Sequence, residues 1–217
     1  METTPDDGHS MALQFDCDKL KNPAEFLEKI SEIKKIVFSA PMDVALSALQ
    51  NGNSHDTPVV ALEYRKNEHM FICSTSSKVV IIFQVDFSDT TDKAIAKVFL
   101  QEFAESQRTI RSAPPVSYSK DPPGELTGVK YNLHPDSVGF ISFALEKRHV
   151  ELNKKEKCIT LLTGFRSYVH YHIKCTKTYL HMRMRHKGAN WLQVLNRAVP
   201  EMETEKKTIA GKTFVRK

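Results

Sequence analysis

The sequence has few of the features that mark membrane, secreted or metal-binding proteins. No apolar run approaches the roughly 18 to 20 residues that a membrane-spanning helix needs; the longest, Val79 to Val85, is interrupted by Gln84. The four cysteines form neither a C-x-x-C pair nor a zinc-site spacing, and the N-terminus is polar and acidic, unlike a secretory signal. We therefore expect a cytosolic protein with reduced thiols and no transmembrane segment.

Acidic residues are missing from one long segment. Residues 157–200 contain eight Lys or Arg and no Asp or Glu, although the net charge of the whole chain is only +5. The rest of the chain is therefore acidic on balance, and the positive charge is concentrated near the C-terminus. Its densest part, 165–187, reads FRSYVHYHIKCTKTYLHMRMRHK. This composition raises three alternatives: a metal site, a nucleic-acid-binding surface, or a surface for an acidic protein.

Length and composition fit a folded globular chain, with 217 residues, 41% of them hydrophobic and 26% charged. Asn22 followed by Pro23 is a good helix start, and the apolar spacing predicts a helix to about residue 51, kinked or restarted at Pro41. Alternating apolar residues in 78–87 predict a half-buried strand. The other expected elements are strands at 59–64, 70–74, 116–118 and 138–145, a helix after Asp89, and a long loop over 111–137.

These elements predict an α+β fold. We expect a two-layer domain of helices on an antiparallel sheet, in the order α-β-β-β-α-β-β-α, which ends in a long C-terminal helix. We expect four parts along the chain. They are a remnant of a first α/β domain at 1–20 with a strand near 9–15, an α+β domain at 21–156, a long basic helix at 157–199 and a charged tail at 200–217.

The long helix should be amphipathic. At ~1.5 Å per residue it would be about 65 Å long, more than the width of a domain of this size. On a helical wheel its basic and apolar residues fall in adjoining arcs. The basic arc contains Arg166, His170, Lys174, Lys177, His181 and Arg185, and the apolar arc contains Leu162, Phe165, Val169, Ile173, Leu180, Met184, Trp191 and Ala198, widened by Tyr168 and Tyr179.

The metal interpretation is weak on helical geometry. His170 and His172 are two residues apart and point to nearly opposite sides, whereas His170 and His181 lie roughly 16 Å apart along the axis. Only His172 and Cys175 have chelating spacing, and a zinc site needs three or four ligands. These histidines are better interpreted as interface and surface residues, and we expect no metal and no cofactor.

Motifs for catalysis are equally weak. Gly211-Lys212-Thr213 resembles the end of a phosphate-binding loop, but the earlier glycine of that motif is replaced by Lys206. The sequence has no G-x-S-x-G and no H-E-x-x-H. We therefore expect a protein that is not an enzyme.

The basic segment leaves two binding alternatives beside an ordinary solvated surface. An exposed helix with an apolar side needs a partner, usually another helix, and its cations would attract an acidic protein. A nucleic-acid-binding module is the alternative, because eight cations lie on one helix. The tyrosines lie mostly on the apolar side, which favours a protein partner.

Five blocks of sequence resemble one known family. The block FRSYVHYHIKCTKTYLHMRMR is long and unusual, and with the others it is similar to the 34-kilodalton subunits of the actin-related protein 2/3 complex. The resemblance covers essentially residues 9–217, and we expect nearly all of the family's first domain to be lacking. The blocks are KVFLQEF (97–103), GFISFALEKRHV (139–150), FRSYVHYHIKCTKTYLHMRMR (165–185), VLNRAVP (194–200) and KTIAGKTF (207–214).

The resemblance implies a non-catalytic scaffold in the cytoplasm, at the actin-rich cell cortex and projections. It implies pairing with the complex's 20-kilodalton subunit through the long helix, support of the two actin-related subunits, and contact with the side of a mother actin filament in branched nucleation. ATP would belong to the actin-related subunits, and no nucleic acid is implied.

Assigning individual residues to these contacts is our inference. For Phe165 and Leu180, burial in the core of this chain is an equal alternative, and Lys206, Lys207 and Lys212 form a solvated tail in the alternative interpretation. For the helix of the partner subunit we expect Phe165, Tyr168, Val169, His172, Ile173, Tyr179, Leu180, Met184, Trp191 and Leu195. For the filament we expect Arg183, Arg185, Lys187, Arg197, Lys206, Lys207 and Lys212.

Overall fold

The computed structural model describes most of the chain and divides it into two compact units, residues 1–173 and 174–217. The boundary lies inside the last helix. The four-part division expected from the sequence remains a prediction. The described residues are 2–3, 12–13, 22–65, 67–107, 109–110, 112–131, 137–151, 153–198, 206–207 and 213–214.

Two helices begin where the sequence places a cap. Helix α1 (Pro23–Gln50) starts after Asn22, whose side-chain oxygen accepts a hydrogen bond from the Glu25 amide at 3.4 Å. It continues through Pro41, so a restart at that residue was the wrong alternative. Helix α2 (Thr90–Gln107) starts after Asp89, whose carboxylate accepts from the amides of Thr91 and Asp92 at 2.8 and 3.0 Å.

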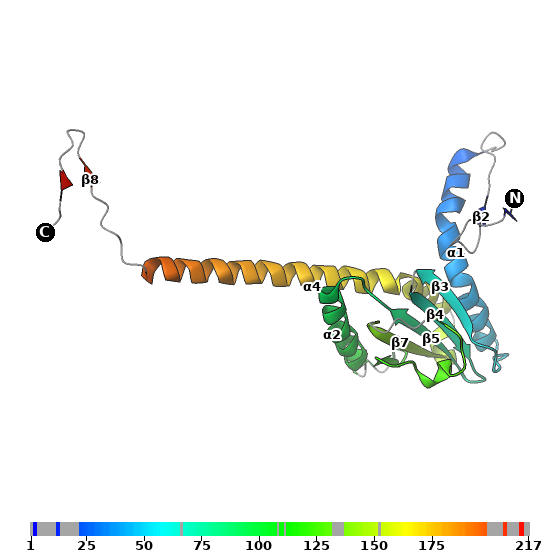
Figure 1. The fold of residues 1–217 in the computed structure, drawn as a ribbon. Coiled ribbons are helices and arrows are strands. Elements are labelled where there is room, and N and C mark those ends of the chain that lie inside the picture. Colours follow the sequence, from blue (N-terminus) through cyan, green and yellow to red (C-terminus); the bar gives the residue numbers. More distant parts are fainter. Residues whose placement is uncertain are drawn as a thin grey trace. The chain divides into compact units, whose positions relative to one another are not determined.

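The main sheet of the first unit has five antiparallel strands in the order β3-β4-β5-β7-β6. Figure 1 shows β3, β4, β5 and β7 side by side, with α1 and α2 beside them. Asn67 lies in the tight turn between β3 and β4 and has a positive φ of 64°. Asn tolerates this backbone conformation better than most residues. The strands are β3 (Val60–Arg65), β4 (Glu68–Ser74), β5 (Lys78–Val85), β6 (Val116–Ser119) and β7 (Gly139–Glu146).

One face of this sheet packs against all the long helices. Ile81, Phe83 and Ile141 are fully buried there, together with Met42 of α1 and Leu100 of α2. The other face has a smaller core in which Phe71, Val80 and Phe140 pack against Leu126 from the 3-10 helix η2 (Gly124–Leu126) in the long loop. Strand β5 is therefore buried on both faces rather than half-buried, because a loop that is polar in sequence covers the second face.

The chain leaves the sheet through a short helix that the sequence did not predict, α3 (Lys147–Val150). Its start is stabilised by a reciprocal cap in which the His149 ring nitrogen Nδ1 accepts from the Glu146 amide at 3.0 Å. The long helix α4 (Lys154–Ala198) follows, starting three residues before the predicted Lys157. The α+β class, the antiparallel sheet, the element order and the long C-terminal helix are confirmed.

The ends of the chain contribute two small strand pairs. Strand β1 (Glu2–Thr3) pairs with β2 (Ala12–Leu13), and β8 (Lys206–Lys207) pairs with β9 (Thr213–Phe214). Strand β2 lies within the strand expected near 9–15, whose other residues are outside the described part. Among the described residues, no helix is long and apolar enough to cross a membrane.

Candidate partner-binding helix

The first part of α4 belongs to the core of the first unit. Phe165 lies at the centre of an aromatic cluster, with ring centroids 5.4 Å from Phe83, 5.8 Å from Phe103 and 5.0 Å from Phe143. Helical spacing brings further apolar residues to the same side every three or four positions. The buried residues of α4 are Ile159, Leu162, Phe165, Val169 and Ile173.

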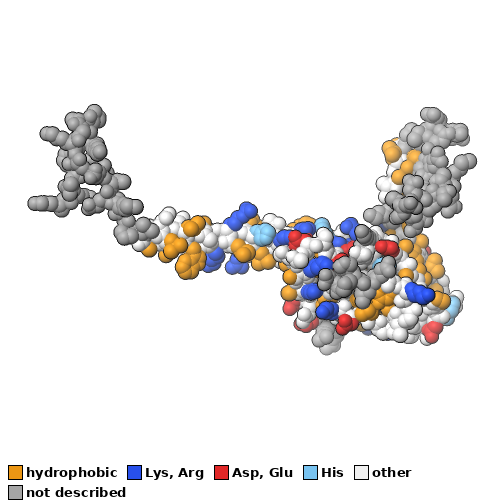
Figure 2. Space-filling view, in the orientation of Figure 1, with side chains coloured by type: hydrophobic (Ala, Val, Ile, Leu, Met, Phe, Trp, Pro, Cys, Tyr) orange, Lys and Arg blue, Asp and Glu red, His pale blue; other side chains and the backbone are white. Residues whose placement is uncertain are grey.

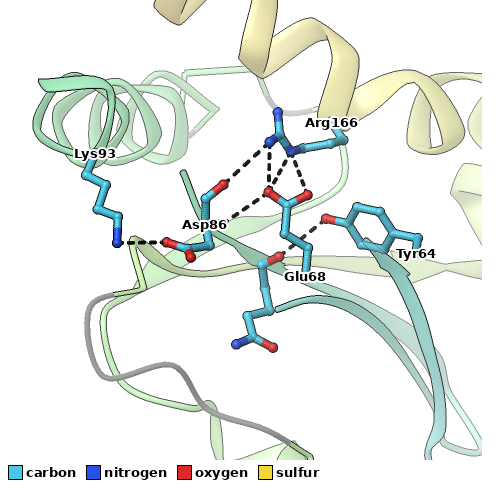
Figure 3. A network of polar contacts seen from close by, with 6 residues as sticks. Tyr64, Glu68, Asp86, Lys93 and Arg166 are labelled. Atoms are coloured by element: carbon cyan, nitrogen blue, oxygen red, sulfur yellow. Dashed lines mark hydrogen bonds and ion pairs between the residues drawn. The ribbon is translucent and has the colours of Figure 1, made fainter. Parts of the chain in front are cut away.

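A buried ion pair holds the same part of α4 to the sheet (Figure 3). The Arg166 Nε lies 2.9 Å from both carboxylate oxygens of Glu68, at the start of β4, and its Nη2 lies 2.8 Å from Oε1. The same Nη2 donates to the Asp86 carbonyl at 3.4 Å, and the guanidinium carbon lies 4.5 Å from the centroid of the Phe87 ring. Asp86 in turn pairs with Lys93 of α2 at 3.2 Å. We call Arg166, Glu68, Asp86, Phe87 and Lys93 the arginine anchor.

Arg166 belongs to the basic arc of the helical wheel, but it is not a solvated surface cation. Its side chain is 11% exposed, because Glu68 balances its charge inside the protein. The hydroxyl of Tyr64 lies at the edge of this network and donates to the Gln84 carbonyl at 3.3 Å. Burial, followed by the negative charge of Glu68, raises the pKa of Tyr64 far above its usual range, so this phenol stays neutral.

The histidines of α4 stack on rings instead of converging on an ion. The His170 ring is stacked on Phe87 at 6.2 Å, and the His172 ring is stacked on Phe99 of α2 at 5.8 Å. Among the described residues, no group of three or more His, Cys, Asp or Glu side chains could hold a metal ion. Cys175, the nearest thiol to His172 in the sequence, is exposed.

An open apolar groove runs beside the first part of α4, within the first unit. Its volume is about 390 Å³, and its rim includes Leu161, which is 73% exposed. The sequence gives no sign of it, because it forms where α2, β6 and β7 meet α4. Its lining residues from α4 are Cys158, Thr160, Leu161, Leu162, Gly164, Phe165 and Tyr168, and those from elsewhere are Phe103, Pro114, Val116, Phe143 and Leu145.

The last part of α4 is exposed on every side. Each residue from Thr178 to Ala198 is exposed, including Trp191 at 67% and Met184 at 70%. Figure 2 shows hydrophobic and basic side chains along this stretch. Monomeric proteins seldom leave so many large apolar side chains in one uninterrupted stretch, so this surface is a candidate interface. We call Tyr179, Leu180, Met184, Trp191 and Leu195 the exposed apolar set; they are 44–70% exposed.

The predicted interface residues fall into three groups by exposure. Phe165, Val169 and Ile173 are at most 6% exposed and face the sheet of their own chain, so they offer no surface to a partner here. Tyr168 is 47% exposed, and His172 is partly buried. The remaining five predicted residues are the exposed apolar set. Sequence reasoning missed Met182, Leu192 and Val194, which are 57%, 64% and 56% exposed.

Four of the predicted filament-binding cations lie on the exposed part of α4. Arg183, Arg185, Lys187 and Arg197 are all exposed, and the Arg183 guanidinium lies 5.6 Å from the centroid of the Tyr179 ring. No acidic residue occurs between Lys157 and Pro200 to neutralise them along the helix. The other three cations, Lys206, Lys207 and Lys212, have side chains outside the described part of the chain.

Comparisons with known proteins agree with one another. The family described as "Arp2/3 complex, 34 kD subunit p34-Arc" matches residues 1–202. Actin-related protein 2/3 complex subunit 2 of Dictyostelium discoideum is 35% identical over 217 residues, which cover 99% of this chain and 73% of that protein. The protein of the same name from Schizosaccharomyces pombe is 34% identical over 235 residues, which cover 98% of this chain and 74% of that protein. The chain therefore belongs to the family of the 34-kilodalton subunit of the actin-related protein 2/3 complex.

Proposed function

We propose that this protein is a non-catalytic scaffold subunit of the actin-related protein 2/3 complex. In this role it pairs with the 20-kilodalton subunit, supports the two actin-related subunits, and contacts the side of a mother filament during branched nucleation. The cytoplasmic actin cytoskeleton would be its place of action. The observation that carries the proposal is the last part of α4, which is exposed throughout and combines large apolar side chains with cations.

The exposed apolar set supports a helical partner. An isolated helix in water gains little stability from its own hydrogen bonds, so a helix with no tertiary packing needs a partner. Leu180, Met184 and Trp191 recur at intervals of four and seven residues, which places them on one side of α4. Burying such side chains contributes about 1.5–3 kcal/mol each. A second amphipathic helix would cover this side.

The cations support an acidic partner surface such as that of an actin filament. Arg183, Arg185 and Arg197 are exposed, so their charges contribute mainly to long-range attraction and orientation. A polyanion such as duplex DNA would meet the same charges, so nucleic-acid binding is the alternative outcome of any test. The proposed filament contact also includes three lysines of the tail, and this assignment rests on the sequence alone: Lys206, Lys207 and Lys212.

Co-purification with the 20-kilodalton subunit tests the pairing. The variant Trp191→Glu/Leu195→Glu places two carboxylates on the proposed helix interface, and we expect it to lose the partner while keeping its fold. The matched control is Ala189→Glu/Gln193→Glu, which adds the same charge to neighbouring exposed positions on another side of α4. Equal recovery of the partner with both variants would contradict the proposed interface.

A further inference from the structure

We infer that Arg166 is a positioning residue that fixes the rotation of the first part of α4, residues 154–173, on the sheet. The inference rests on the proposed pairing, because the rotation decides how Tyr168 and His172, two residues of the proposed interface in the first unit, face a partner. Helix α4 is continuous from Lys154 to Ala198. A turn of its first part about the axis would move the side chain of Tyr168, which is 47% exposed, and that of His172.

Apolar packing alone specifies this rotation weakly. Ile159, Leu162, Phe165, Val169 and Ile173 present a broad apolar side to the sheet, and hydrophobic contact has no direction of its own. The groove of about 390 Å³ lies along the side of α4 that carries Leu161 and Tyr168. Because that side has open space, packing does not block a turn of the helix in this direction.

The arginine anchor supplies the direction that the apolar contacts lack. Arg166 and Leu161 lie on opposite flanks of the buried side of α4, at ~100° per residue. The planar guanidinium meets both oxygens of Glu68 at 2.9 Å and lies 4.5 Å from the Phe87 ring centroid. Such a fork satisfies its hydrogen bonds in a narrow range of orientations, unlike an ammonium group.

The Glu68 carboxylate is itself held in one position, so the Arg166 side chain pairs with a fixed partner. Glu68 is 3% exposed, and its Oε1 accepts from the Asp86 amide at 3.4 Å. The Asp86 carboxylate is tied to Lys93 of α2 at 3.2 Å. A buried ion pair of this kind contributes little net stability compared with apolar residues of similar size, but it can specify one arrangement over others. The structure therefore assigns the pair to orientation more than to stability.

Two histidine stacks report the rotation directly. His170 stacks on Phe87 with 9° between the planes, and His172 stacks on Phe99 with 12°. The two histidines lie on opposite flanks of α4, so a turn of the helix would disturb both stacks. The ring Cε1 protons of His170 and His172 therefore give nuclear magnetic resonance signals that monitor the angle of α4.

The test replaces the ion pair by apolar residues of similar length, in the full chain. For Glu68→Met/Arg166→Met we expect a cooperative unfolding transition with an unchanged or higher urea midpoint, together with shifted or split His170 and His172 signals. We also expect about tenfold weaker binding of the 20-kilodalton subunit, equivalent to roughly 1.4 kcal/mol. Arg166→Lys keeps the positive charge but loses the planar guanidinium group. The His170 and His172 signals of this variant should therefore move in the same direction, but by less.

The matched control removes another ion pair of α4, that between Lys155 and Asp43, whose Nζ–Oδ1 distance is 2.7 Å. It has neither a guanidinium fork nor a ring beneath it, so Asp43→Asn/Lys155→Met should leave both histidine signals unchanged. Unchanged signals in folded Glu68→Met/Arg166→Met would overturn the inference. If that variant fails to fold, unchanged signals in Arg166→Lys would overturn it. Failure of the wild-type chain to bind the partner would contradict the proposed pairing instead, while the signals would still decide the role of Arg166.

Discussion

Phe165 and Leu161 lie one turn apart on α4 in opposite surroundings. Phe165 is 6% exposed among three other phenylalanine rings, whereas Leu161 is 73% exposed at the groove. Phe165→Ala should lower the free energy of unfolding by about 3–5 kcal/mol, through lost burial and the cavity left behind. Leu161→Ala should change it by no more than about 0.5 kcal/mol. Urea denaturation of both variants checks this, and equal costs would contradict the described packing.

His149 makes stability depend on pH. Its Nδ1 accepts from the Glu146 amide, and its Nε2 is buried without a hydrogen-bond partner among the described residues. Burial lowers the pKa of His149 below its usual 6.5, helped by the charge of Arg148 and then of Lys154, while Glu146 acts in the opposite direction. The unfolded chain therefore takes up this proton at a higher pH than the folded chain, so stability should fall as the pH drops below about 6.5.

A variant that keeps the cap but does not titrate isolates this effect. In His149→Asn the amide oxygen can accept from the Glu146 amide in place of Nδ1. Between about pH 7.5 and about pH 5.5, the wild-type chain should lose more free energy of unfolding than this variant, by at most about 1.4 kcal/mol per pH unit. Parallel pH profiles for the two proteins would show that His149 does not titrate differently on folding.

At the scale of elements, the sequence predicts best where local signals and burial agree. Asn22 and Asp89 cap their helices because their side chains reach backbone amides of the next turn. The short helix α3 was missed because Glu146 and His149 form its cap in place of the usual Ser or Thr with Glu or Gln. Strand β5 appeared half-buried because Leu126 and Tyr131, which cover its second face, come from a proline-rich loop far along the chain.

The candidate site was predictable in composition and only partly in position. The acid-free segment and its apolar spacing point to α4 as a candidate binding helix. These sequence features do not reveal that Arg166 forms an ion pair. Glu68 lies 98 residues away in the sequence, and only the tertiary fold brings it to Arg166. For the same reason Phe165 and Leu180 look equivalent on a helical wheel, although only Phe165 is buried.

The two parts of α4 should differ in hydrogen exchange. Residues 178–198 have no tertiary burial in this chain, so their amides should exchange quickly when the chain is alone. Amides around Val169 and Ile173, which are fully buried, should exchange slowly. Adding the 20-kilodalton subunit should slow exchange in 178–198 and leave 159–173 little changed. Slow amide exchange of residues 178–198 in the chain alone would contradict the view that this part of α4 lacks packing within its own chain.

For the whole molecule, the charge distribution makes the chain asymmetric. The net charge of +5 comes from the C-terminal part, where eight cations between 157 and 200 meet no acid. Such a field attracts any acidic surface, and the attraction weakens with salt. Charge alone therefore does not distinguish an actin filament from a nucleic acid, and a competition between the two is needed.

Co-sedimentation with actin filaments in the presence of excess duplex DNA is the most direct test of the scaffold role. The chain is co-expressed with the 20-kilodalton subunit, beside the variant Arg183→Glu/Arg185→Glu. We expect the wild-type pair to pellet with filaments despite the DNA, and the variant to pellet several-fold less while keeping its fold and its partner. Pelleting that DNA abolishes would contradict filament binding by this chain, and would identify the exposed part of α4 as a general polyanion-binding surface.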